Sequence, residues 1–175
     1  AGFHPSLIDS EPNALLWGVR NPFSAKASNE PIMIVNIGNK KTTIVVWAQE
    51  LVRFSSSVKM GMAGGQRDYL AMDWEHWVKT NKEEWAVTQK NLLSLTKKLR
   101  EYIDYYNEHS AGAAKEITKV IVSGAWANFP ELLDFFAKKL GIPVAKPESI
   151  IPVHPAYTTA LGLALRGIYE EYYAK

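Results

Sequence analysis

The sequence predicts an α/β fold in which a mixed five-stranded sheet carries helices on both faces. Three runs of apolar or β-branched side chains, separated by short turns, occupy residues 32–55 and predict an antiparallel meander. Two units follow in which a helix with an apolar stripe precedes a short buried strand. Because such crossovers are right-handed, we expect two βα crossovers to add parallel strands beside the meander.

The N-terminal residues predict a short extended stretch at 5–8 followed by a helix. Asp9 or Ser10 can cap this helix. Pro12 suits its first turn, where the N–H group that proline lacks has no helical partner. Residues 21–30 are rich in polar and turn-forming side chains, which is typical of a linker.

The meander is predicted from composition. Residues 32–37 are nearly all apolar, as expected of a strand that is covered on both faces. A turn at 38–40 leads to residues 42–47, which are rich in β-branched side chains, and a second turn leads to an alternating strand at 51–55. Residues 61–68 have the glycine content of a loop.

A long helix is predicted from about residue 82 to residue 109, because apolar side chains recur along it at spacings of three and four. The stripe comprises Leu92, Leu95, Leu99, Ile103 and Tyr106. Residues 117–122 then predict a further buried strand.

The last third of the chain predicts a helix, a short strand and a final helix. Asn128 can cap the first of these helices, Gly141 closes it and Pro143 prevents its continuation. The short strand is expected at 142–144 and the final helix at about 155–173. The side chains expected to face inward from the two helices are Leu132, Leu133, Phe136, Leu140, Leu161, Leu165, Ile168 and Tyr172.

Composition excludes several classes of function. The chain has 175 residues and a net charge of +2, which lacks the basic excess of a dedicated nucleic-acid binder. It contains no cysteine, so disulfides and thiolate metal sites are excluded, and its four histidines show no ligand spacing. No run approaches the ~20 apolar residues of a membrane span, so direct membrane insertion is not expected.

No catalytic constellation is visible in the sequence. Serine, histidine and aspartate side chains show no nucleophile-elbow or triad spacing, and Asp73 and Glu75 have no acid–base context. The aromatic-rich segment at 69–85 has two interpretations, a cap over the core or an exposed patch for a partner.

Five stretches resemble a known family in order and spacing. IVNIG at 34–38, with the threonines at 42–43, looks like the second phosphate hairpin of actin-fold ATPases. LREYIDYY at 99–106 resembles a helix of the type IV pilus assembly PilM family. IVSGAWANFPEL at 121–132 is similar to the adenosine-binding turn of the superfold, and AYTTALGLALR at 156–166 looks like the last helix of the PilM family. AGFHP at the start, with Ile8 and Asp9, matches the close of the family's first domain.

The resemblance implies an actin-like, ribonuclease H-like subdomain and the second half of a two-domain protein. Residues 1–28 would then be the remnant of the first domain, a strand and hinge helix with a linker, and residues 29–175 the second domain. Residues 61–108 would be a partly inserted helical segment. Cell-division FtsA and the actin-like component of type II secretion share this architecture, but the two helix motifs favour PilM.

A nucleotide site of this superfold needs a hairpin from each domain, and the first hairpin is not in this sequence. The resemblance assigns the second to Asn36, Gly38, Asn39, Lys40 and Thr42, with Lys40 and Lys41 suited to a phosphate. The alternative is that Lys40 and Lys41 are exposed to solvent at the tip of the hairpin and bind nothing. The family usually has aspartate at position 36, and the uncharged amide of Asn36 is a poor ligand for Mg²⁺.

The adenosine turn would comprise Gly124, Ala125, Trp126 and Asn128, with Ala125 and Trp126 where glycines are usual. Trp126 would fill the purine slot, stack on a base, or pack over an empty pocket. We therefore expect weakened or lost ATP binding. No cofactor is expected in this chain by itself, whereas an intact parent could take ATP with Mg²⁺.

Small side chains on two helices predict a close crossing, because they let helices approach each other. They are Ala14, Gly18, Ala160, Gly162 and Ala164. The resemblance places such a crossing at the hinge between domains. The alternative is that small residues merely suit packing on a sheet.

The resemblance implies a cytoplasmic assembly or scaffold component of the type IV pilus inner-membrane platform, peripheral to the membrane through protein partners. Expected partners are platform proteins and the pilus motor ATPases, and self-association through an unpaired N-terminal strand is a further expectation. Two alternatives remain open. One is an actin-fold ATP-binding protein or ATPase completed by the missing domain, and the other is a secretion or cell-division scaffold of the same fold.

Overall fold

The computed structural model describes residues 7–19, 30–49, 51–61, 73–110, 116–148 and 151–172. In chain order its elements are α1 (Glu11–Val19), β1 (Ile32–Ile37), β2 (Thr42–Ala48), β3 (Leu51–Val58), α2 (Trp74–Thr80), α3 (Lys82–His109), β4 (Lys119–Ser123), η1 (Ala125–Asn128), α4 (Leu132–Leu140), β5 (Val144–Ala145), η2 (Pro155–Tyr157) and α5 (Thr158–Tyr172). The η segments are 3₁₀ turns.

The strands form one mixed sheet in the order β3-β2-β1-β4-β5. β1 pairs antiparallel with β2, and β2 pairs antiparallel with β3, so the predicted meander is confirmed. β1 pairs parallel with β4, and β4 with β5, as the two predicted crossovers require. The predicted fold class, a mixed five-stranded sheet with helices on both faces, is therefore confirmed.

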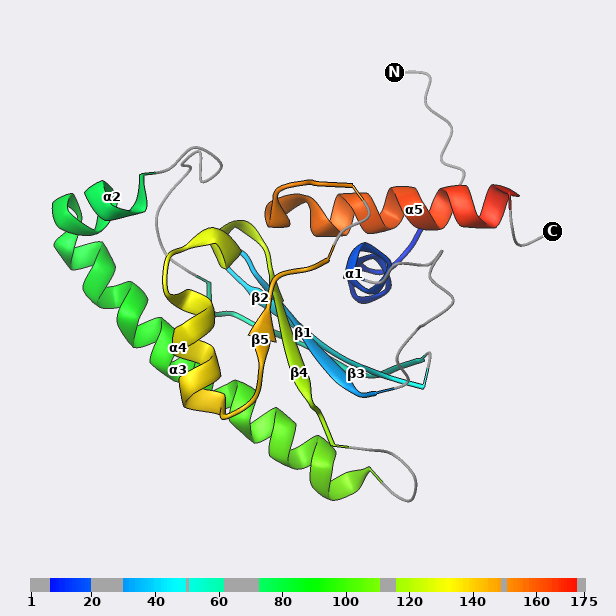
Figure 1. The fold of residues 1–175 in the computed structure, drawn as a ribbon, viewed down its shortest axis with the longest axis horizontal. Coiled ribbons are helices and arrows are strands. Elements are labelled where there is room, and N and C mark those ends of the chain that lie inside the picture. Colours follow the sequence, from blue (N-terminus) through cyan, green and yellow to red (C-terminus); the bar gives the residue numbers. More distant parts are fainter. Residues whose placement is uncertain are drawn as a thin grey trace.

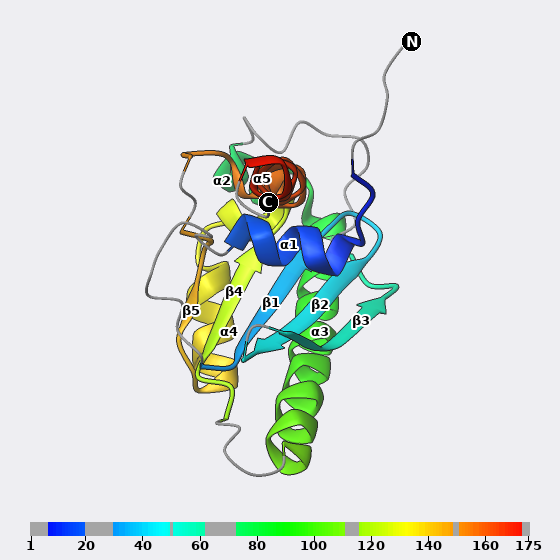
Figure 2. The same ribbon diagram turned by 90° about the vertical axis from the view of Figure 1, so that its right-hand side faces the viewer.

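The two faces of the sheet carry different helices (Figures 1 and 2). α3 and α4 cover one face, and α2 lies beside the start of α3. On the other face α1 lies over the strands, and α5 crosses α1 rather than the sheet itself.

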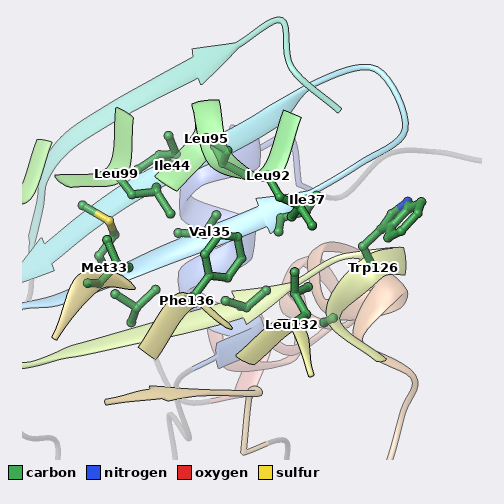
Figure 3. Close-up of a cluster of buried hydrophobic side chains, with 14 of the residues drawn as sticks. Met33, Val35, Ile37, Ile44, Leu92, Leu95, Leu99, Trp126, Leu132 and Phe136 are labelled. Atoms are coloured by element: carbon green, nitrogen blue, oxygen red, sulfur yellow. The ribbon is translucent and has the colours of Figure 1, made fainter. Parts of the chain in front are cut away.

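The larger core lies under α3 and α4 (Figure 3). Alternate side chains of β1, including Met33, Val35 and Ile37, point into it and meet Leu95 and Leu99 of α3. A smaller apolar cluster on the opposite face joins α1 to the sheet. Its buried members are Leu15, Leu16, Val19, Ile34, Val45, Trp47 and Ile121.

Several element boundaries differ from the prediction for local reasons. Asn128 does not cap α4, because residues 125–128 form a 3₁₀ turn and Glu131 occupies the N-cap in a left-handed conformation with φ 62°. Helix α2, in the aromatic-rich segment, was not predicted; Asp73 caps it by accepting from the His76 N–H at 2.9 Å. The final α-helix begins at Thr158, after a 3₁₀ turn that contains Pro155.

Candidate functional site

Three segments meet where β1 and β4 end. They are the turn after β1, the glycine turn after β4 and the start of α1. Asn36 and Ser123 are register partners on the neighbouring parallel strands, and both contribute side chains here. In open α/β sheets, the carboxyl ends of parallel strands are the usual place for ligands. Figure 1 shows both turns at the same end of the sheet.

Asn36 uses its side chain for contacts within the chain. Its Nδ2 donates to Glu11 Oε1 at 3.2 Å, and its Oδ1 accepts from Ser123 Oγ at 3.3 Å. The amide therefore ties α1 and β4 to β1.

Glu11 is the central polar residue of the site, and sequence reasoning missed it. Its Oε1 also accepts from Thr43 Oγ1 at 3.0 Å, and its Oε2 lies 2.6 Å from Lys41 Nζ. Partial burial acts to raise the pKa of the Glu11 carboxyl, but the hydrogen bonds from Lys41, Thr43 and Asn36 and the charge of Lys41 outweigh it. The pKa consequently lies below its usual value.

The hairpin turn is closed by the Gly38 N–H, which donates to the Lys41 carbonyl at 3.0 Å. Asn39 and Lys40 are exposed at its tip. A Cβ on Gly61 would lie 2.3 Å from the Asn39 carbonyl, so the chain after β3 passes directly behind the turn. Thr42, whose place in a nucleotide site stays a prediction, donates from Oγ1 to the Met60 carbonyl at 2.6 Å. The neighbouring Thr43 is the threonine that reaches Glu11.

Gly124 requires glycine for two reasons. Its φ of 93° is disfavoured for other residues, and a Cβ there would lie 2.3 Å from the Ile37 carbonyl. Its N–H donates to the Pro155 carbonyl at 3.0 Å, which connects this turn to the segment before α5.

Trp126 points away from this surface and into the larger core. Its side chain is 0% exposed. Its ring centroid lies 5.0 Å from Trp74, 5.7 Å from Trp77 and 5.6 Å from Phe129. Figure 3 shows it at one end of the apolar cluster. In this conformation the indole is part of the core and is not placed to stack on a base. Ala125 packs at the edge of the same cluster, and Asn128 is half-buried.

The predicted helix crossing is present between α1 and α5. A Cβ on Gly162 would lie 1.7 Å from the Ala14 carbonyl, and one on Gly18 would lie 2.1 Å from the Thr158 carbonyl. Ala14 is buried, whereas Ala160 and Ala164 are exposed and lie outside the contact. That this crossing acts as a hinge stays a prediction.

An ion pair fastens the two ends of the described chain together near the crossing. Arg166 on α5 contacts the carboxylate of Asp9, which precedes α1. Burial acts to raise the Asp9 pKa, but bonds from Arg166, Asn13 and Ser10 and the charge of Arg166 hold that pKa below its usual value.

Within the described ranges, no cluster of three or more histidine or acidic side chains could hold a metal ion. No described helix is both long and apolar enough to span a membrane.

The meander extended by two parallel strands, with a crossing helix pair on one face, matches solved structures of the actin-like fold. Among solved structures the chain is similar to a structure of the PilM-PilN type IV pilus biogenesis complex, with a TM-score of 0.68 and 19% identity. It is also similar to MreB5 of Spiroplasma citri bound to AMPPNP, with a TM-score of 0.61 and 14% identity. A third is the ethanolamine utilization protein EutJ from Carboxydothermus hydrogenoformans, with a TM-score of 0.57 and 20% identity.

These three matches cover 95%, 94% and 89% of this chain, but only 54%, 59% and 53% of the matched chains. The chain therefore spans about half the length of these solved proteins. No protein-family model and no curated protein matches it. The likeness establishes the actin-like fold; the division into a first-domain remnant and a second domain stays a prediction.

Proposed function

We propose that this chain is part of a PilM-like scaffold of the type IV pilus inner-membrane platform, with a weakened or lost nucleotide site. The observation that carries the proposal is the likeness to the PilM-PilN complex over 95% of the chain. The family motifs at 99–106 and 156–166 support it, because they lie on α3 and on the η2–α5 segment of the matching fold.

The weakened nucleotide site is supported by the contacts of its candidate residues. The Asn36 amide is engaged on both atoms, and Glu11 accepts from Lys41 and Thr43 beside the turn. Trp126 is fully buried against other aromatic rings. We infer that the hairpin serves chiefly to position α1.

Partners and location follow from the same proposal. A cytoplasmic scaffold would be held at the inner membrane by platform proteins, and the motor ATPases are a second class of expected partner. Contacts with such partners would use protein surface rather than a bound cofactor.

An ATP-binding protein of the same fold is the second candidate. The observation in its favour is that the similar Spiroplasma citri structure holds AMPPNP. In this alternative a second lobe would complete the site, with Mg²⁺ neutralising the phosphates.

Calorimetric titration of a chain that carries both lobes of the fold with ATP and Mg²⁺ tests the weakened site, because one lobe alone would not complete the site in either case. No binding below millimolar ATP is expected, whereas saturable micromolar binding would favour the ATP-binding protein. Co-purification with the platform proteins encoded in the same genome tests the scaffold role. The surface variant Glu75→Gln serves as a control and should co-purify to the same extent as wild type.

A further inference from the structure

β3 is an edge strand whose outer side pairs with none of the described elements. It lies at one end of the sheet and pairs with β2 alone, and Figure 2 shows it at the margin of the sheet. Alternate residues of an antiparallel edge strand direct their N–H and C=O groups away from the partner strand. The register with β2 is regular from residue 54 to residue 58, so this stretch is a template for one more strand.

The charges along this edge are all of one sign. Residues 51–61 contain Arg53 and Lys59 but no acidic residue, and both basic residues are exposed. The guanidinium group of Arg53 donates to the Ala48 carbonyl and to the Gln49 side chain, and further N–H donors of this group remain available. The regular stretch of β3 is therefore flanked by a cation at each end.

A cavity of about 410 Å³ opens between the start of β3 and the C-terminal end of α3. Arg53 and Phe54 line it from the strand, and Tyr105, Tyr106 and His109 line it from the helix. The rings of Tyr105 and His109 stack with their centroids 4.3 Å apart, and Tyr105 is 56% exposed. A strand added beside β3 would direct alternate side chains to this face, where aromatic rings can hold an apolar side chain.

The same charges disfavour a second copy of this chain as the added strand. Two copies of the regular stretch, paired antiparallel about Ser56, would place Arg53 of each beside Lys59 of the other. Like charges at facing positions destabilise a strand pair. A strand with a carboxylate near each end would instead place opposite charges beside both cations.

We propose that the outer edge of β3 is a docking site for an extended acidic segment of a partner protein. The segment adds a sixth strand to the five-stranded sheet by main-chain pairing with residues 54–58. Its carboxylates lie beside Arg53 and Lys59, and one apolar side chain enters the cavity beside Tyr105. The inference rests on the proposed scaffold role, because a scaffold needs a surface that binds protein, and it assigns that surface and the chemistry of its partner.

The test is calorimetric titration of the full chain with a synthetic peptide at low ionic strength. The probe is Ac-Glu-Val-Thr-Val-Thr-Val-Glu-NH₂, whose β-branched residues favour an extended conformation. Its control peptide has lysine in place of each glutamate. The acidic peptide should bind at least about tenfold more tightly than the lysine peptide.

Four variants locate the binding site. Lys59→Glu should remove most of the preference for the acidic peptide, and Arg53→Gln, a second variant at the other end of the stretch, should lower it about threefold. Tyr105→Ala should weaken binding of the acidic peptide about threefold, because the cavity loses one wall. The matched control is Lys138→Glu at an exposed position of α4, which should behave as wild type.

Hydrogen–deuterium exchange separates strand addition from attraction between charges alone. The acidic peptide should slow the exchange of amides within residues 54–58, because outward N–H groups become hydrogen-bonded. An analogue of the acidic peptide that is N-methylated at its central residues lacks donors for this pairing. It should neither bind as tightly nor protect these amides.

Several outcomes would overturn the inference. They are equal binding of the acidic and lysine peptides, an undiminished preference in both Lys59→Glu and Arg53→Gln, and binding without protection of residues 54–58. Protection of the same amides that rises with protein concentration in the absence of peptide would also overturn it, because a second copy would then occupy the edge. None of these results touches the scaffold role, whereas failed co-purification with platform proteins would overturn that role and leave the peptide result standing.

Discussion

The two faces of the sheet are stabilised in different ways. Under α3 and α4, large side chains fill a deep apolar volume, and Trp126, Phe136, Leu95 and Leu99 are fully buried in it. On the opposite face α1 and α5 meet through glycines, and polar side chains join separate elements at its edges. The stability of the first face depends on large side chains that fill its interior. The stability of the second depends on the close approach of two helix backbones and on side-chain hydrogen bonds and ion pairs between separate elements.

This difference predicts opposite responses to substitution. Removing atoms should damage the α3–α4 face most, because a cavity forfeits packing. Adding atoms should damage the α1–α5 face most, because backbone atoms already touch there. Removing a charge should lower the free energy of unfolding clearly only where the charged side chain connects two separate elements.

The largest expected effect is from Trp126→Ala. Loss of a fully buried indole should lower the free energy of unfolding by about 3–5 kcal/mol, as measured by urea denaturation followed by circular dichroism. The matched control is Trp17→Ala on the other face, whose half-buried ring contacts Tyr169 at 5.1 Å. A Trp126→Ala cost no larger than the Trp17→Ala cost would contradict the assignment of Trp126 to the core.

The next effect is from Gly162→Ala. The added methyl group would meet the Ala14 carbonyl at 1.7 Å, so α1 and α5 must separate. We expect a loss of about 1–3 kcal/mol in the free energy of unfolding. Gly167→Ala is the control on the same helix; no described atom lies within 4 Å of its Cβ. The free energy of unfolding of Gly167→Ala should rise by about 0.5–1 kcal/mol, because alanine has the higher helix propensity. An unchanged free energy of unfolding for Gly162→Ala would refute the close crossing.

Acidification should weaken the α1–α5 face. The pKa values of Glu11 and Asp9 are lowered in the folded protein, so the unfolded chain binds more protons as pH falls. The stabilisation contributed by these two carboxylates should be fully present above about pH 5. It should be lost as the pH falls through their lowered pKa values in the folded protein.

Glu11→Gln isolates the glutamate's share of this loss. Relative to wild type it should cost about 1 kcal/mol near neutral pH, and the difference should shrink as pH falls. The measurement is urea denaturation at several pH values. A constant difference between pH 7 and pH 3 would mean that the Glu11 charge contributes nothing.

The sequence was sufficient to predict the strands from runs of apolar and β-branched side chains, and α3 from its apolar stripe, because each of these signals lies within one element. It was insufficient for Glu11, since nothing local to position 11 reveals partners 25 to 32 residues away. Trp126 was ambiguous for a related reason. Its burial depends on Trp74 and Trp77, and these lie on a helix that was not predicted.

The smallest effect is expected from Glu75→Gln on α2. Glu75 Oε1 lies 2.6 Å from Lys79 Nζ, as short as the contact between Glu11 and Lys41, but both side chains belong to one helix and are mostly exposed. Water screens such a pair, and its loss should change the free energy of unfolding by no more than about 0.5 kcal/mol. If urea denaturation gives a cost equal to that of Glu11→Gln, then bond length rather than the joining of separate elements governs these ion pairs. A smaller cost supports the view that Glu11 matters because it connects α1 to the sheet.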